Sequence, residues 1–112
     1  MSKVKIAWLR LTEWWAGPRK VIEVQGYLPL DQLPSRDLVL LHEGGEAWSI
    51  MMRCPCGCAQ PVELPLIREA HPRWSLQVDE DGHPTLAPSV WRRDGCRAHY
   101  FVRRGKVLWV WN

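Results

Sequence analysis

The chain has 112 residues, 46% of them apolar, and a formal charge of +3, so it has enough apolar side chains to form one hydrophobic core. This length predicts a single domain over residues 1–112, because two cores of half the size would each be too small to be stable. The charge is mild and acidic residues are interleaved with basic ones, so composition establishes no broad surface for nucleic acid. Neither an apolar run of about 18 residues nor a secretory signal is found, which predicts a cytoplasmic protein with no membrane partner.

The first third of the chain contains two apolar segments separated by a turn. Residues 3–11 are a short, mostly apolar stretch, and residues 20–28 alternate as a strand does. Gly17 and Pro18 between them predict a turn. Residues 29–36 contain two prolines and allow a single helical turn at most. No segment shows a helical period over ten residues.

The rest of the chain predicts three hairpins. The first joins residues 37–42 to 47–52 through Gly44 and Gly45, the second joins 74–78 to 85–91, and the third joins 99–102 to 107–111. Residues 61–67 form an edge strand, because prolines at both ends limit its pairing. This pattern predicts a mainly β fold: a small single-domain sandwich or roll with several hairpins.

All four cysteines fall in two short clusters, Cys-Pro-Cys-Gly-Cys at 54–58 and Cys-Arg-Ala-His at 96–99. Thiols stay reduced in the cytosol, so such clusters indicate metal ligands rather than disulfides. Two chelating clusters are also the usual way to supply tetrahedral zinc. Five side chains compete for four positions, and the favoured set is Cys54, Cys56, Cys96 and His99. Cys58 could replace either of its neighbours, and a site of four cysteines without His99 remains open.

A metal with four protein ligands has no open position for an activated water, so the predicted zinc ion is structural. Loops of this kind occur in zinc ribbons and, with iron, in Rieske proteins; a Rieske-like redox protein is one alternative, although the first cluster lacks the histidine it needs. Ser89 is a candidate nucleophile, but no Gly-x-Ser-x-Gly elbow surrounds it and no base is placed by sequence. No catalytic residue is therefore assigned, and a role without catalysis is favoured.

Two further features of the composition bear on partners. Eight tryptophans are predicted to lie mainly in the core, with one of the adjacent Trp14 and Trp15 at the surface. Basic residues, Arg97 among them, gather in the last third of the chain. Five of them allow a second class of function, a nucleic-acid-binding zinc protein: Arg92, Arg93, Arg103, Arg104 and Lys106.

From residue 34 to residue 111 the order of motifs resembles an uncharacterised bacterial zinc-binding family. The shared features are Cys-x-Cys-Gly-Cys at 54–58, a Pro-x-x-x-Pro-Leu sequence at 61–66, Trp74, Asp81-Gly82, Thr-Leu-Ala-Pro-Ser-Val at 85–90, Cys-Arg-Ala-His-Tyr-Phe-Val at 96–102 and Val-Leu-Trp at 107–109. The chain departs from the family at residues 90–93, where Val-Trp-Arg-Arg replaces Ile-Gly-Asn-Trp.

Genes of the family are often found beside bacterial ubiquitin-like proteins and their activating and conjugating enzymes. The resemblance therefore implies a zinc-stabilised protein-interaction or accessory module in ubiquitin-like conjugation or phage defence. Its expected partner is a ubiquitin-like protein or one of the conjugating enzymes.

Overall fold

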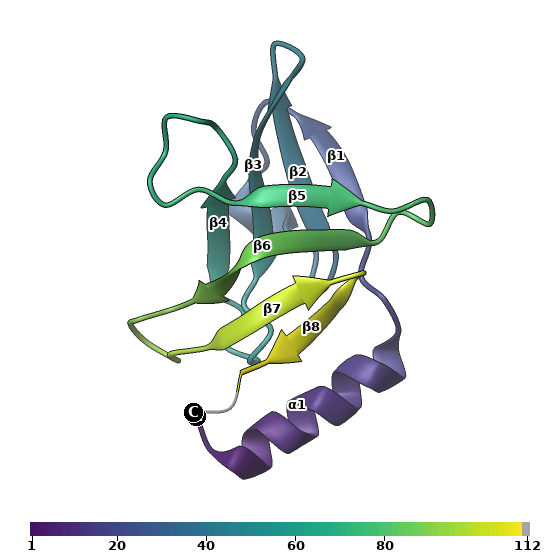
Figure 1. Cartoon of the computed structure of the whole chain (residues 1–112), viewed down its shortest axis with the longest axis vertical. Coiled ribbons are helices and arrows are strands. Elements are labelled where there is room, and N and C mark those ends of the chain that lie inside the picture. The colour runs from purple at the N-terminus through teal and green to yellow at the C-terminus, as the bar shows by residue number, and fades with distance from the viewer. Residues whose placement is uncertain (111–112) are drawn as a thin grey trace.

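The computed structural model describes residues 1–110 and confirms the mainly β class: two four-stranded sheets face each other, and one helix lies beside them (Figure 1). The elements in chain order are α1 (Lys3–Ala16), β1 (Val21–Gln25), a 3-10 turn η1 (Leu30–Gln32), β2 (Leu38–Glu43), β3 (Glu46–Arg53), β4 (Pro61–Pro65), β5 (Ser75–Val78), β6 (Pro84–Trp91), β7 (His99–Arg103) and β8 (Lys106–Trp109). Within residues 1–110 no helix is long and apolar enough to cross a membrane.

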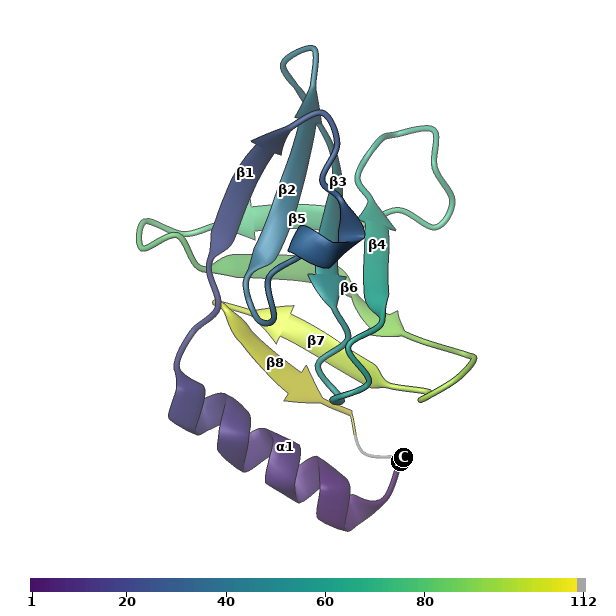
Figure 2. The ribbon, with the colours of Figure 1, turned by 180° about the vertical axis from the view of Figure 1, so that it is seen from behind.

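The first sheet has the strand order β1-β2-β3-β4, with β1 parallel to β2 and the other pairs antiparallel. Gly44 and Gly45 both have positive φ and form the two-residue turn between β2 and β3, which confirms the predicted hairpin. The predicted edge strand is β4. The segment that carries η1 crosses the back of β2 and β3 (Figure 2), so both faces of β2 are buried and its sequence is apolar at successive positions.

The second sheet has the order β5-β6-β7-β8 and is antiparallel throughout, which confirms the second and third predicted hairpins. Trp111, expected in the last strand, lies outside the described residues. Gly105 is required in the turn between β7 and β8, because it has a φ of +80° and an added Cβ would lie 2.5 Å from the carbonyl oxygen of Arg19.

The main core lies between the two sheets. It combines the inward side chains of β2, β3 and β4 with those of β6, β7 and β8, and Tyr100 at its centre is fully buried. Two of the cysteines, Cys54 and Cys56, belong to this core. The cysteine cluster is therefore continuous with the packing that joins the sheets.

The 14-residue helix α1 contradicts the prediction that no segment is helical. Ser2 caps its first turn by accepting a hydrogen bond from the Lys5 N–H at 3.1 Å, and Gly17 ends it with a φ of 82°. Ile6 packs into the core, yet the opposite side of the helix is also apolar. A helix with apolar residues on both sides lacks the polar face that reveals a helical period in sequence.

A buried ion pair attaches α1 to the second sheet. The Glu13 carboxylate accepts hydrogen bonds from Arg19 Nε at 2.9 Å and Arg19 Nη2 at 2.8 Å, and from the Val107 backbone N–H at 2.9 Å. Glu13 and Arg19 are only 7% and 4% exposed. The bond from Val107 satisfies a backbone group of β8, which is the edge strand of its sheet. One carboxylate thus holds the helix, the loop at Arg19 and the sheet edge together.

Replacement of Glu13 tests this attachment. Glu13→Ala leaves the Arg19 guanidinium buried without its partner, so we expect the free energy of unfolding to fall by about 3–5 kcal/mol. Burial raises the pKa of Glu13, but Arg19, the Val107 N–H and Arg36 together hold it below 4.5. The negative charge of Glu13 stabilises the fold fully above pH 4.5, the ordinary pKa of a glutamate. This stabilisation is lost as the pH falls through the lower pKa that Glu13 has in the folded protein.

Urea unfolding followed by tryptophan fluorescence between about pH 6 and pH 3 measures this dependence. We expect the stability advantage of the wild-type protein over Glu13→Gln to shrink as the pH falls. Glu46→Gln, at an exposed position on β3, is the matched control and should run parallel to the wild type. If the difference in unfolding free energy between the wild type and Glu13→Gln does not change with pH, Glu13 is not charged in the folded protein.

Candidate metal centre and serine–histidine pair

The structure brings together the sulfur atoms of all four cysteines. Cys54, Cys56 and Cys58 lie in the loop between β3 and β4, and Cys96 lies between β6 and β7. The loop is closed by the Cys54 N–H, which donates to the Gln60 carbonyl at 2.8 Å, and Gly57 turns it with a φ of 101°. The cluster therefore joins a connection of the first sheet to a connection of the second.

The spacing of these sulfurs fits a tetrahedral metal ion. All four Sγ atoms lie within 4.8 Å of one another, and those of Cys54 and Cys96 are 3.6 Å apart. Sulfurs that each bind zinc at about 2.3 Å would lie roughly 3.8 Å from one another in a regular tetrahedron. None of the four forms a disulfide. The cluster can hold one metal ion with no change of fold.

The surroundings of the cluster favour negatively charged sulfurs on its outer side. Arg92 points Nη1 at the sulfurs of Cys58 and Cys96, at 3.5 and 3.7 Å. Burial raises the pKa of Cys58, but hydrogen bonds from the Gln60 backbone and from the neighbouring thiols outweigh it and lower the pKa to about 7. Burial raises the pKa of Cys54, which is only 3% exposed and therefore stays protonated until a cation replaces its proton.

His99, a member of the favoured ligand set, lies elsewhere and contacts Ser89. Its Nε2 is 3.0 Å from Ser89 Oγ, and its ring stacks on Trp91 with the ring centres 4.6 Å apart and the planes 5° from parallel. His99 is not part of the group of donor atoms that the structure gathers around the sulfurs. The chain instead forms a serine–histidine pair beside the cysteine cluster.

Ser89 is directed toward His99 by an irregularity in β6. Leu86 pairs with Val102 and Val90 pairs with Tyr100, so residues 87–89 lie opposite the single residue Phe101. A bulge of this kind redirects side chains and is common beside active sites. Pro88 has no N–H for the strand ladder, and the Ser89 carbonyl accepts a bond from Trp74 Nε1 at 3.4 Å.

The geometry of the pair suits proton transfer from the hydroxyl to the ring. With the proton of a neutral imidazole on Nδ1, Nε2 is free to accept from Ser89 Oγ. Among residues 1–110, His99 Nδ1 is buried and has no hydrogen-bond partner, so the described chain provides a dyad rather than a triad. Trp91 fixes the plane of the ring and is itself covered by the Arg93 guanidinium, 4.1 Å from the ring centre.

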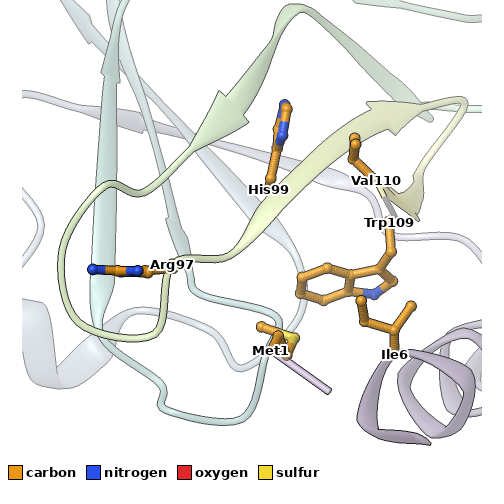
Figure 3. A pocket seen from close by; sticks show the side chains of 6 residues that line it. All are labelled: Met1, Ile6, Arg97, His99, Trp109 and Val110. Atoms are coloured by element: carbon orange, nitrogen blue, oxygen red, sulfur yellow. The ribbon is translucent and has the colours of Figure 1, made fainter. Parts of the chain in front are cut away.

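Neither of the two best-formed cavities is a binding site for a small molecule at this pair. One cavity, of about 70 Å³, lies between the start of α1 and the ends of β7 and β8, and Ile6, His99 and Trp109 are among the residues that line it. Figure 3 shows that the ring of His99 is directed away from Ile6 and Trp109. The other, of about 190 Å³, lies between α1 and β8. Small-molecule sites enclose about 300–1,000 Å³. Ser89 lines neither of these two cavities.

The sequence predicts Ser89 as a candidate nucleophile and His99 as a metal ligand. The sequence alone does not reveal the register between β6 and β7. In this register His99 pairs with Trp91 and lies on the same face as Ser89. The irregular pairing of residues 87–89 has no sequence signal beyond Pro88.

Comparison with known proteins gives one family. The family described as "Bacterial ubiquitination-like system serine protease (BubE)" matches residues 24–110. No curated protein and no solved structure matches the chain significantly. The match includes both strands of the serine–histidine pair and all four cysteines, and it excludes α1.

Metal content distinguishes the four-cysteine set from the set with His99. If the four sulfurs are the ligands, Cys58→Ser should lose metal and lower the free energy of unfolding by about 3 kcal/mol or more, because metal binding is coupled to folding. His99→Ala should keep one metal ion per chain. Elemental analysis after dialysis, paired with thermal unfolding, measures both. Retention of metal by Cys58→Ser together with its loss from His99→Ala would instead support His99 as the ligand.

Proposed function

The chain belongs to the family of bacterial ubiquitination-like system serine proteases, and on this premise we propose that it is a serine hydrolase with Ser89 as nucleophile and His99 as general base. The observation that carries the proposal is the 3.0 Å contact between Ser89 Oγ and His99 Nε2. Nucleophile and base within hydrogen-bond reach are the recognisable signature of this chemistry, whatever the fold.

The reaction follows from the two groups. Ser89 Oγ attacks the carbonyl carbon of an amide and passes its proton to His99 Nε2. The C–N bond then breaks, His99 returns the proton to the leaving amine, and an acyl ester remains on Ser89. Water, activated by the same imidazole, hydrolyses the ester and restores the hydroxyl. Each proton moves through the one nitrogen that faces Ser89.

A polypeptide is the substrate that this surface fits best. The pair lies on a strand surface beside Trp91, which is exposed, rather than in a closed cavity. Membership of a ubiquitination-like system indicates protein partners. The substrate we propose is a ubiquitin-like protein, joined through its own peptide chain or through an amide to a target.

The metal has a structural role in this proposal, and zinc is the ion that four thiolates in a tetrahedron favour. The four sulfurs would complete its coordination, so its contribution is to fix the ends of the strands that carry the pair. Cys96 precedes His99 by three residues, and Arg92, which faces the sulfurs, follows Ser89 by three. A colourless protein with stoichiometric zinc would remove the iron alternative.

The earlier expectation of an interaction module is compatible with this assignment, because a protease of a conjugation system must bind its protein substrate. The nucleic-acid alternative stays a prediction. Of its basic residues, Arg92 faces the sulfurs, Arg93 stacks on Trp91 and Arg103 stacks on Phe101. Three of the five basic side chains therefore already make contacts with other side chains of the protein.

Cleavage assays with single variants test the proposal. The substrates are a ubiquitin-like protein of such a system in two forms, one extended at its C-terminus by a reporter and one joined to a target lysine. We expect Ser89→Ala and His99→Ala each to lower the rate of cleavage by at least about 10³-fold, because loss of either group abolishes the activated nucleophile.

The control is Ser35→Ala, which removes an exposed hydroxyl from the loop between η1 and β2 and should leave the rate unchanged. Metal content and the unfolding midpoint of each variant show whether it is folded. Cleavage that persists in Ser89→Ala, or a folded and metal-loaded wild type that cleaves neither form of the substrate, would refute the assignment.

A further inference from the structure

The outer face of α1 is an exposed apolar stripe. Its four members are Val4, Trp8, Leu11 and Trp15, which are 81%, 62%, 56% and 83% exposed. At 100° per residue they fall within a sector of about 60°. Figures 1 and 2 agree that the sheets lie on one side of the helix only, and Ile6 and Glu13 face that side. Trp8, predicted to lie in the core, is therefore on the surface, and both Trp14 and Trp15 are exposed where only one of them was expected to be.

We propose that this stripe, Val4-Trp8-Leu11-Trp15, pairs with the same stripe of a second copy of the chain to form a two-fold dimer with antiparallel α1 helices. The helix lies outside the residues that the family model matches, so membership of the family does not assign this surface. The proposal is also independent of the hydrolase assignment.

The spacing of the stripe favours contact with a second helix. Steps of four, three and four residues are those of a coiled-coil seam, which packs against another helix of the same spacing. The order of these steps is the same in both directions along the helix. In an antiparallel pair each large residue therefore meets a smaller one: Trp15 lies opposite Val4 of the second copy, and Trp8 lies opposite Leu11. An isologous contact of this kind is closed and stops at two chains.

The exposed apolar area of the helix is also large enough for an interface. Together with Trp14, which is exposed at the edge of the stripe, these side chains present on the order of 700 Å² of apolar surface. A stable interface buries about 800 Å² on each partner, and soluble monomers seldom expose so large a continuous apolar patch. The helix face is thus close to the size that a specific dimer requires.

The charges at the two ends of α1 favour the antiparallel orientation. The first turn of α1 contains Lys3 and Lys5 and no acidic residue, and the last turn contains no basic residue. Lysines at the positive N-terminal end are unfavourable for their own helix. In an antiparallel pair they lie beside the negative C-terminal end of the second helix, where Arg36 already donates to the carbonyls of Ala16 and Gly17 at 3.4 and 2.9 Å. In a parallel pair they would face each other.

Molar mass in solution tests the proposal. By sedimentation equilibrium of the metal-loaded full chain, we expect a reversible species of twice the 13.1 kDa of one chain. Trp8→Glu and Trp15→Glu should each raise the dissociation constant of the dimer by at least about 30-fold. Trp48→Glu, at an exposed tryptophan on β3, is the matched control and should leave the constant unchanged. Trp15, the most exposed of the four, keeps the test valid if Trp8→Glu fails to fold.

The orientation has its own variant. Lys3→Glu combined with Lys5→Glu suits the dipole of the single helix but places acids beside the C-terminal end of the second helix, so the antiparallel dimer should weaken. An unchanged dissociation constant would overturn the antiparallel arrangement. A chain that is monomeric at every concentration, or a dimer insensitive to Trp8→Glu and Trp15→Glu, would overturn the dimer. So would a monomer that floats with vesicles of phosphatidylglycerol and phosphatidylcholine, which would identify the stripe as a lipid-binding face.

Discussion

The meeting of four cysteine sulfurs between two chain connections is the constraint on which both the fold and the candidate site depend. One connection joins β3 to β4 in the first sheet and the other joins β6 to β7 in the second, so a bound metal would link the sheets at one end. For a chain of 112 residues such a link would add stability that a small core provides only in part. The second connection also leads directly into His99. Loss of the link would therefore affect the fold and the serine–histidine pair together.

A second constraint acts at the β8 edge of the second sheet. β8 would expose unpaired backbone groups there, and α1 covers this edge through the Glu13 carboxylate and its bond to Val107. The helix that protects the edge turns its other, apolar side to the solvent. The two proposals thus use different elements: α1 pairs two chains, and β6 with β7 carries the reaction. A dimer would contain two serine–histidine pairs related by its two-fold axis.

The sequence predicts the strands well because alternation and glycine turns are local signals, as at Gly44 and Gly45. It predicts the cysteine cluster for a similar reason, since chelating ligands lie close together in the chain. The helix is missed because apolar residues on both of its sides hide the helical period. The pairing of Ser89 with His99 is missed because it depends on a strand register with an irregular stretch at residues 87–89. The sequence therefore predicts His99 as a metal ligand, whereas in the structure it contacts Ser89.

Covalent labelling of Ser89 tests the central claim most directly, because it needs no knowledge of the substrate. The metal-loaded protein is treated with a fluorophosphonate, which reacts with serines activated by a base, and the adduct is mapped by peptide mass spectrometry. The account predicts one adduct per chain, on Ser89, formed by the wild type and not by His99→Ala. It also predicts that labelling falls when a chelator removes the metal. A folded wild type that forms no adduct, or forms one on another serine, would contradict the assignment of Ser89 and His99 as a reactive pair.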